Sequence, residues 1–203
     1  SGTLRIGASH FFTKYVLPGL LKDFKTLHPA IEYRVRTGWS KDVVQAVLQN
    51  DVHVGFIRGN YSWTGIRRLL FTEHMRIAHH KKFTLGQLSE LPLIQYTNDP
   101  SNQALIDNWW AEHFSVPPQT GMVVDRVDSC LEMVKTGLGY GFLPSTILHG
   151  VTGLQTRKMR YRSGLLLERS TWMILKEETA SLRLVREFVK RIERADFSDL
   201  HCP

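Results

Sequence analysis

Apolar runs of strand type alternate along the first third of the chain with stretches of helical spacing. The clearest strand signal lies in residues 31–36, where apolar and charged residues alternate and predict one buried face. Pro18 interrupts the first helical stretch and predicts a kink or a restart there. Such an order calls for parallel strands and right-handed crossovers. We expect strands at residues 4–7, 31–36 and 52–57, and helices at residues 10–27 and 40–48.

The same β-α-β-α-β order recurs after residue 80, and its last crossover is the most complete. Ser129 and Glu132 have the S-x-x-E spacing of a capping box, with Asp128 as a further N-cap candidate. Gly137 suits the left-handed position that ends a helix. The pattern also predicts helices at residues 101–114, 129–136 and 179–194, and a short helix opened by a Thr84–Gln87 capping box. It predicts extended segments at residues 66–71, 75–80, 93–96, 122–124, 142–143, 154–160 and 165–175.

Two successive β-α-β-α-β units predict an α/β fold of two Rossmann-like lobes, each with its own sheet. The first lobe is expected to comprise residues 3–77 plus 172–203, and the second residues 78–171. Extended segments at residues 72–80 and 168–176 would join them as two hinge strands. Two crossings leave a cleft between the lobes, which is where open α/β proteins bind small molecules.

The composition is typical of a globular protein, with 42% hydrophobic and 22% charged residues among 203. No apolar run approaches the roughly 20 residues of a membrane span, and no secretory signal opens the chain, so we expect a cytoplasmic protein without a membrane contact. Ser1-Gly2 has the character of a cloning remnant. The net charge is +7, and residues 1–77 hold 11 Lys and Arg against 5 Asp and Glu. Because no arginine-rich run indicates a nucleic-acid surface, we interpret most of these residues as a solvated face and some of them as guiding an anionic ligand.

The cysteines and histidines give little reason to expect a metal or a cofactor. Cys130 and Cys202 are interpreted as two unrelated thiols in a reducing compartment. His79 and His80 are adjacent in an expected strand, so their side chains should point to opposite faces and not hold one ion together. We therefore predict no metal and no cofactor.

Three blocks of the sequence resemble one family. They read LRIGASHFFTKYVLPGLLKDFKTLHPAIEYRVRTG, then VHVGFI, and then VDSCLEMVKTGLGYGFLP. With their spacing they resemble the effector-binding domain of LysR-type transcriptional regulators over nearly the whole chain, from Leu4 to about Ile192. Departures are His53-Val54-Gly55, where an acidic residue and an alanine are common, and the bulky Trp39 in its turn.

This resemblance implies a fold similar to type II periplasmic binding proteins and a small effector held between the lobes. It also implies a homodimer through this domain, a tetramer of the full-length regulator, and DNA binding only through a winged helix-turn-helix domain that precedes this region. The function expected is effector sensing for a bacterial DNA-binding transcription regulator, with a small, anionic metabolite as effector.

Strand-to-helix turns of the first lobe supply most candidate effector contacts. A serine hydroxyl and free backbone N–H groups suit a carboxylate, a glycine lets backbone approach the ligand, and a tryptophan can stack on it. An arginine at the end of the third strand has the geometry to pair with a carboxylate, although a solvated surface arginine is the more common case. The candidates are Ser9, His10, Phe11, Thr37, Gly38, Trp39, Ser40 and Arg58.

The second lobe contributes the equivalent turns. Tyr96, Thr97 and Asn98 follow its first strand, and Asp128 lies at the start of its second helix. Phe142 would line the cleft or fill the core. For each of these a purely structural role in a turn, cap or core is the alternative.

Two other function classes fit parts of the pattern. An extracytoplasmic solute-binding protein would share the fold, but the missing signal and unpaired cysteines argue against it. Gly7-Ala8-Ser9-His10-Phe11 partly matches the G-x-S-x-G nucleophile elbow of hydrolases. Its last glycine is replaced by Phe11, and no acid–histidine pair is identifiable, so no enzyme is predicted.

Overall fold

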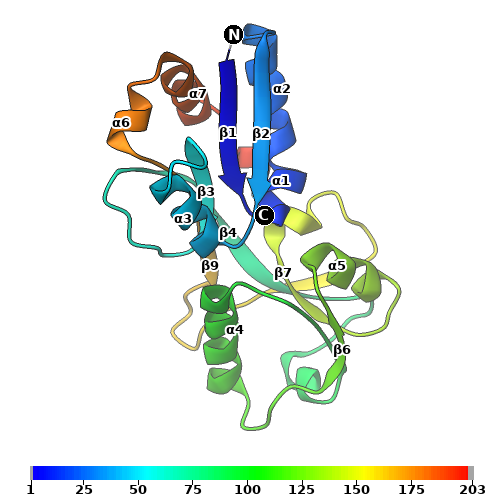
Figure 1. Ribbon diagram of the computed structural model, residues 1–203. Helices are drawn as coiled ribbons and strands as arrows, with labels where there is room; N and C mark the ends of the chain where they lie inside the picture. Colours follow the sequence, from blue (N-terminus) through cyan, green and yellow to red (C-terminus); the bar gives the residue numbers. More distant parts are fainter. Residues whose placement is uncertain (1, 201–203) are drawn as a thin grey trace. The chain divides into compact units, whose positions relative to one another are not determined.

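The computed structural model describes residues 2–200 of the chain, which form a mixed α/β fold (Figure 1). Its strands are β1 Gly2–Ala8, β2 Ile31–Thr37, β3 Val54–Arg58, β4 Ile66–His79, β5 Leu93–Tyr96, β6 Thr120–Val124, β7 Gly141–Pro144, β8 Gln155–Lys158 and β9 Glu168–Leu175. Its α-helices are α1 His10–Tyr15, α2 Leu17–Leu27, α3 Ser40–Leu48, α4 Pro100–His113, α5 Val127–Lys135, α6 Glu177–Ala180 and α7 Arg183–Glu193. Short 3₁₀ turns cover Leu85–Ser89, Ser145–Leu148 and Ser198–Leu200.

The described chain divides into two compact units. Unit 1 contains the chain up to Phe71 together with Ser170–Ser198, and unit 2 contains Thr72–Arg169. Both changes of unit fall inside a strand, in β4 and in β9. The two connections between the units are therefore continuous extended backbone.

Each unit contains the parallel strand order that its sequence pattern predicts. In unit 1, β1 pairs in parallel with both β2 and β3, and Ala8 lies opposite Thr37 and Phe56. In unit 2, β5 pairs in parallel with β6, and Leu93 forms a parallel bridge with Tyr140 just before β7. Because the connections are helices, the carboxyl ends of these strands gather at one edge in each unit.

The expectation of a separate sheet in each lobe is wrong in one respect. A single strand order, β2-β1-β3-β9-β4-β7 with β8 on β4, includes strands of both units. The connecting strands β4 and β9 are hydrogen-bonded neighbours in this order. A sequence pattern shows that both segments are extended but not that they pair.

β4 is one long strand, where the sequence pattern predicts two extended segments, at residues 66–71 and 75–80. Glu73 is buried, and its carboxylate accepts hydrogen bonds from the backbone N–H and the hydroxyl of Thr146. The strand continues because this buried carboxylate has partners, which the periodicity of apolar residues does not reveal.

Helix boundaries follow the sequence closely at several positions. Val16 separates α1 from α2 and Pro18 lies in the first turn of α2, as the predicted restart requires. The Thr84–Gln87 capping box is present. Gly137 has a φ of +85° directly after α5, which confirms its role in ending that helix.

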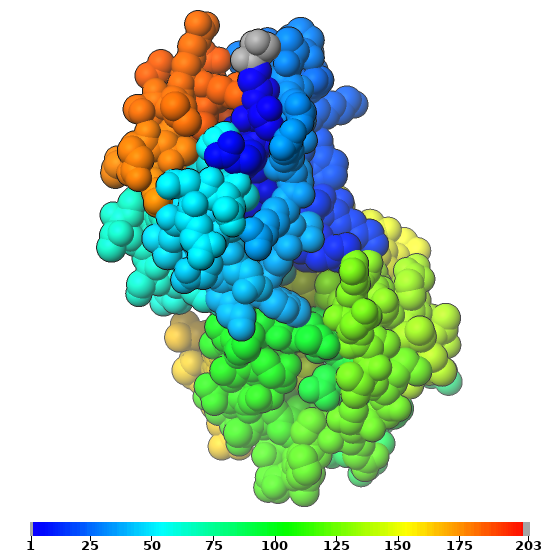
Figure 2. Space-filling model, viewed as in Figure 1, coloured from blue at the N-terminus to red at the C-terminus, as the bar shows by residue number. Residues whose placement is uncertain are grey.

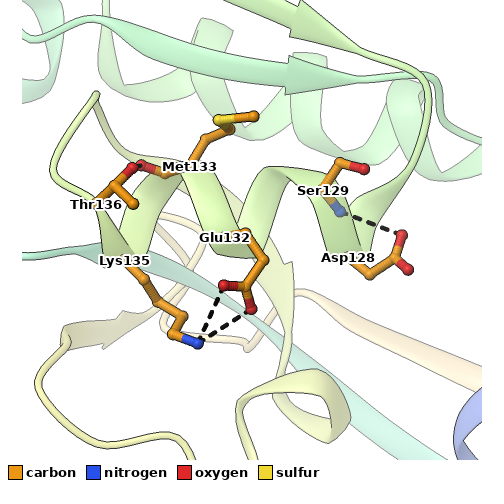
Figure 3. A network of polar contacts seen from close by, with 6 residues as sticks. All are labelled: Asp128, Ser129, Glu132, Met133, Lys135 and Thr136. Carbon is orange, nitrogen blue, oxygen red and sulfur yellow. Dashed lines mark hydrogen bonds and ion pairs between the residues drawn. The ribbon is translucent and has the colours of Figure 1, made fainter.

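Other boundaries differ from the predictions. α5 begins at Val127, so Ser129 lies inside its first turn and forms no capping box with Glu132 (Figure 3). Instead, Asp128 Oδ1 accepts the Ser129 backbone N–H at 3.1 Å, and Glu132 pairs with Lys135 at 3.0 Å (Figure 3). The expected helix at residues 179–194 is divided into α6 and α7, because the backbone of Leu182 is extended.

The core of unit 1 surrounds β1, whose Leu4, Ile6 and Ala8 are fully buried. α7 covers it with a stripe at positions i, i+3, i+4 and i+7, which is the pattern of a helix with one buried face. Phe188 of this stripe meets Phe24 edge to face, with ring centroids 5.2 Å apart. The stripe consists of Val185, Phe188, Val189 and Ile192.

β2 is a strand at the sheet edge, and its carboxyl-terminal half is exposed on both sides. Ile31 is buried and Tyr33 is half-buried, but Val35 is 39% exposed. Blue atoms of β2 are visible at the surface in Figure 2. The alternation in residues 31–36 thus predicts the strand correctly and its buried face only in part. An exposed edge strand is available for pairing or packing with another chain.

The thiol and imidazole groups are placed as follows. Cys130 is buried, its Sγ contacts the carbonyl oxygen of Ile94 at 3.3 Å, and burial raises its pKa to about 12. Cys202 lies outside the described residues.

The prediction that the side chains of His79 and His80 point to opposite faces is wrong, since the centroids of their rings lie 4.5 Å apart. β4 ends at His79, so His80 does not continue the alternation of the strand. Within residues 2–200 no group of three metal-ligating side chains is found.

His53 makes the stability of unit 1 sensitive to acid. Its Nδ1 accepts the Arg5 backbone N–H at 3.1 Å, and partial burial together with the Arg5 charge lowers its pKa below 6.5. The folded state therefore favours the neutral imidazole. Its contribution to stability is complete above pH 6.5 and is lost as the pH falls towards the lowered pKa.

We expect His53→Asn, which retains an acceptor that does not titrate, to reduce the loss of unfolding free energy between about pH 7 and pH 5. Urea unfolding followed at several pH values measures this loss. His149→Gln, at an exposed histidine, serves as the control. An unchanged pH dependence in the His53 variant would exclude this role.

Candidate functional site

The carboxyl ends of β1, β2 and β3 bring most of the first-lobe candidates together in unit 1. Ala8, the last residue of β1, lies opposite Thr37, and its carbonyl accepts the Gly38 N–H at 3.1 Å. The strand register thus places the turn after β1 beside the turn after β2. Arg58, the last residue of β3, completes the same edge.

Ser9 is the N-cap of α1. Its Oγ accepts the backbone N–H of Phe12 at 3.1 Å, which satisfies one of the N–H groups left open at a helix start. A serine hydroxyl that accepts one hydrogen bond still has its own proton to donate. Ser9 can therefore cap the helix and bind an oxygen acceptor at the same time.

Arg58 is buried, so its interpretation as a solvated surface arginine is wrong. The residue is 6% exposed, and its guanidinium carbon lies 4.3 Å from the centroid of the Phe11 ring. Stacking of this kind fixes the plane of the guanidinium group and adds a cation–π attraction. A buried, oriented arginine is a stronger candidate for carboxylate recognition than a mobile one.

Ser40 holds the backbone of Arg58 rather than capping α3. The helix begins at Ser40 itself, and Trp39 occupies the N-cap position without a side-chain hydrogen bond. The buried Ser40 Oγ accepts the Arg58 N–H at 3.0 Å and donates to the Arg58 carbonyl at 3.3 Å. Ser40 is thus a positioning residue for Arg58.

The remaining unit 1 candidates are at the surface. His10 and Thr37 are exposed, Gly38 is half-buried, and Trp39 is 42% exposed. In the described part of the chain the Thr37 hydroxyl makes no hydrogen bond. Trp39 is therefore not packed into the core of unit 1.

The second-lobe candidates lie in unit 2 and fall into two groups. Tyr96 is buried and its hydroxyl donates to the carbonyl of Phe142 at 2.8 Å, so these two residues form part of one wall. The Thr97 N–H donates to the Val124 carbonyl at 3.1 Å, and the Asn98 Oδ1 accepts from Asn102 Nδ2 at 2.8 Å. The first group, Tyr96, Asn98 and Phe142, lines a cavity of about 250 Å³. Thr97 and Asp128 do not line this cavity.

Sequence reasoning does not find the other residues that line this cavity. On α4 they occupy positions i, i+3, i+4 and i+7, which is a single helix face of mixed polarity. The spacing can be counted in the sequence. The faces of α4 differ little in hydrophobicity, however, so no amphipathic pattern marks this one. The four residues are Gln103, Ile106, Asp107 and Trp110.

No helix among residues 2–200 combines the length and the apolar character that crossing a bilayer requires. Most of the positive charge of the first 77 residues lies in unit 1, which also contains the buried Arg58. Together with the Ser9 hydroxyl they provide hydrogen-bond donors and positive charge. This arrangement can hold an anion.

Comparisons with known proteins agree on one family. The sequence model described as the LysR substrate binding domain matches residues 1–196. The chain is 37% identical over 188 residues to an uncharacterized HTH-type transcriptional regulator, YraN, of Bacillus subtilis strain 168, covering 93% of this chain and 65% of YraN. This chain thus spans slightly less than two thirds of that relative's length.

Solved structures show the same fold. The cofactor-binding domain of the Cbl transcriptional regulator matches with a TM-score of 0.78 at 19% identity, over 98% of this chain and 92% of that one. The regulatory domain of HypT from Salmonella typhimurium, in its apo form, also has a TM-score of 0.78, at 16% identity, over 94% and 93% of the two chains. At these identities the likeness concerns the fold alone.

Proposed function

This chain belongs to the LysR substrate binding domain family, and from that premise we propose that it senses a small anionic effector for a bacterial regulator of transcription. Its curated relatives are transcriptional regulators rather than enzymes. The observation that carries the proposal is the convergence of Ser9, Thr37 and Arg58 at the ends of three adjacent parallel strands.

These three side chains suit a carboxylate. The hydroxyls of Ser9 and Thr37 are neutral donors, and the Arg58 guanidinium supplies positive charge and paired N–H groups. Phe11 below Arg58 and the exposed Trp39 add flat apolar surface for the body of the effector. Gly38 permits a close approach to the backbone, and His10 lies next to the cap.

Effector binding can act on a regulator only if the effector binds one conformation more tightly than another. We propose that the two extended connections, β4 and β9, are the hinges along which this difference arises. Thr97, Asn98 and Asp128 of unit 2 remain candidate contacts in this scheme.

The whole regulator is proposed to act in the cytoplasm as a homodimer that forms a tetramer, with DNA held by a winged helix-turn-helix domain outside this chain. The relatives' names include HTH, and the relatives are longer than the part matched. The exposed edge strand β2, with Val35 at its surface, is the face proposed to meet a second copy. A role as an extracytoplasmic solute-binding protein is not favoured, because the relatives are regulators.

A thermal-shift screen against small carboxylates, amino acids and aromatic acids tests the effector site. An effector at roughly 100 times its Kd should raise the Tm by about 5 °C or more. Ser9→Ala or Thr37→Val should remove most of this shift. Thr26→Val, at an exposed threonine of α2, is the matched control.

An effector whose shift survives both substitutions would contradict the proposed site. Covalent labelling of Ser9 by a serine-reactive phosphonate would instead favour a hydrolase. The two results are distinguishable, because the first concerns binding and the second a chemical modification.

A further inference from the structure

Unit 2 contains a cavity of about 250 Å³ between α4 and β5 (α4 in Figure 1). All of the residues that line it belong to unit 2. Its walls are mainly apolar, and its volume is near the lower end of known ligand pockets, which run from about 300 Å³ upwards. This volume corresponds to a molecule built on one ring. The apolar lining includes Leu93, Ile106, Trp110, Pro117, Pro118 and Phe142.

The aromatic wall is fixed before any ligand binds. The Trp110 indole Nε1 donates to the Val116 carbonyl at 2.7 Å, and its ring stacks on Phe114 with centroids 4.1 Å apart. The hydrogen bond from Tyr96 to the Phe142 carbonyl holds the adjoining part. A preformed wall lowers the entropy cost of binding.

Three polar side chains of the lining, Asp107, Asn98 and Gln95, offer hydrogen bonds to a ligand. Gln103 Nε2 donates to Asp107 Oδ1 at 2.8 Å, which leaves the second carboxylate oxygen as an acceptor. Asn98 Oδ1 accepts from Asn102, which leaves the Asn98 amide nitrogen as a donor. Within residues 2–200 the Gln95 side chain makes no hydrogen bond, so both ends of its amide are available.

The charge of the lining selects against anions. Asp107 is its one charged residue, and no Lys, Arg or His lines the cavity. The Asp107 carboxylate would therefore repel an anionic ligand, with no cation in the lining to compensate. The same carboxylate would attract a protonated amine. The unit 1 site around Arg58 has the opposite preference.

From these observations we propose that unit 2 holds a second ligand site, which takes a single-ring aromatic or similarly compact apolar molecule bearing an uncharged or cationic hydrogen-bonding group. The ring lies against Trp110 and Phe142, and the polar group meets Asp107 and Gln95. Its lining shares Asn98 with the effector contacts proposed above but does not include Ser9, Thr37 or Arg58.

Three probes with the same ring test the proposal: benzylamine, benzyl alcohol and benzoate. Each is titrated into the ¹⁵N-labelled chain while the Trp110 indole N–H and the Gln95 and Asn98 side-chain amides are followed by NMR, with Trp110→Phe used for assignment. Benzylamine and benzyl alcohol should produce saturable shifts with a Kd on the order of 1 mM. Benzoate should bind at least about tenfold more weakly at these signals.

Asp107→Asn, a change at an exposed residue, should weaken the binding of benzylamine by about threefold and leave the binding of benzyl alcohol unchanged. Asp125→Asn, at an exposed acid that does not line the cavity, is the matched control. Ser9→Ala should leave all three titrations unchanged, so failure of the unit 1 site and failure of this one are separable. Equal binding of benzoate and benzylamine, or the absence of saturable shifts at Trp110, would overturn the proposal.

Discussion

Replacing Trp109 by alanine should lower the free energy of unfolding of unit 2 by about 3–5 kcal/mol. Trp109 is 1% exposed and is among the largest fully buried side chains of the protein. Its ring packs edge to face on Phe142 at 5.8 Å between centroids, and its Nε1 donates to the Arg160 carbonyl at 2.8 Å. Alanine would leave a large cavity and remove the hydrogen bond to the Arg160 carbonyl.

Urea unfolding followed by circular dichroism measures this loss. Trp39→Ala removes the same side chain from a 42% exposed position in unit 1, and it should cost less than about 1 kcal/mol. If both substitutions cost the same, Trp109 does not anchor the core of unit 2.

Replacing Arg58 by glutamine should reduce the affinity for a carboxylate effector by about 10–100-fold. A hydrogen bond to a charged group is worth about 1.5–3 kcal/mol, and each 1.4 kcal/mol changes Kd tenfold. Glutamine retains a polar side chain but loses the charge and the guanidinium plane that stacks on Phe11 at 4.3 Å. Arg58→Lys should recover part of the affinity, because it keeps the charge without the paired geometry.

Calorimetric titration with an acid that stabilises the wild-type chain gives these affinities. Arg67→Gln is the matched control, because Arg67 also lies in unit 1 and over an aromatic ring, at 3.8 Å from the Trp172 centroid. Equal losses for the Arg58 and Arg67 variants would assign the effect to general charge rather than to the proposed site.

The strands and helices of both units could be predicted because their apolar residues follow simple periods. β2, β5 and the restart at Pro18 are examples in which local pattern and local chemistry agree. Glu73 shows the limit of this reasoning. Its burial in β4 depends on Thr146, more than 70 positions away in the chain, and no local pattern contains that partner.

The candidate site could be predicted as far as topology determines it. The ends of parallel strands necessarily share an edge, which places Ser9 near Thr37. The burial of Arg58 depends on its packing against Phe11 and on the hydrogen bonds of Ser40, which no local pattern shows. The first residue of a helix is also hard to predict from sequence. The capping box predicted at Ser129 is wrong for this reason, because α5 begins at Val127.

The most direct test of the effector site is an NMR titration of the ¹⁵N-labelled chain with succinate, glutamate and benzoate. An acid that binds should shift the backbone amides of Ser9, Phe12 and Gly38 and the side-chain signals of Arg58 in one saturable step. Saturable binding of these acids that leaves all of those signals unmoved would contradict the account.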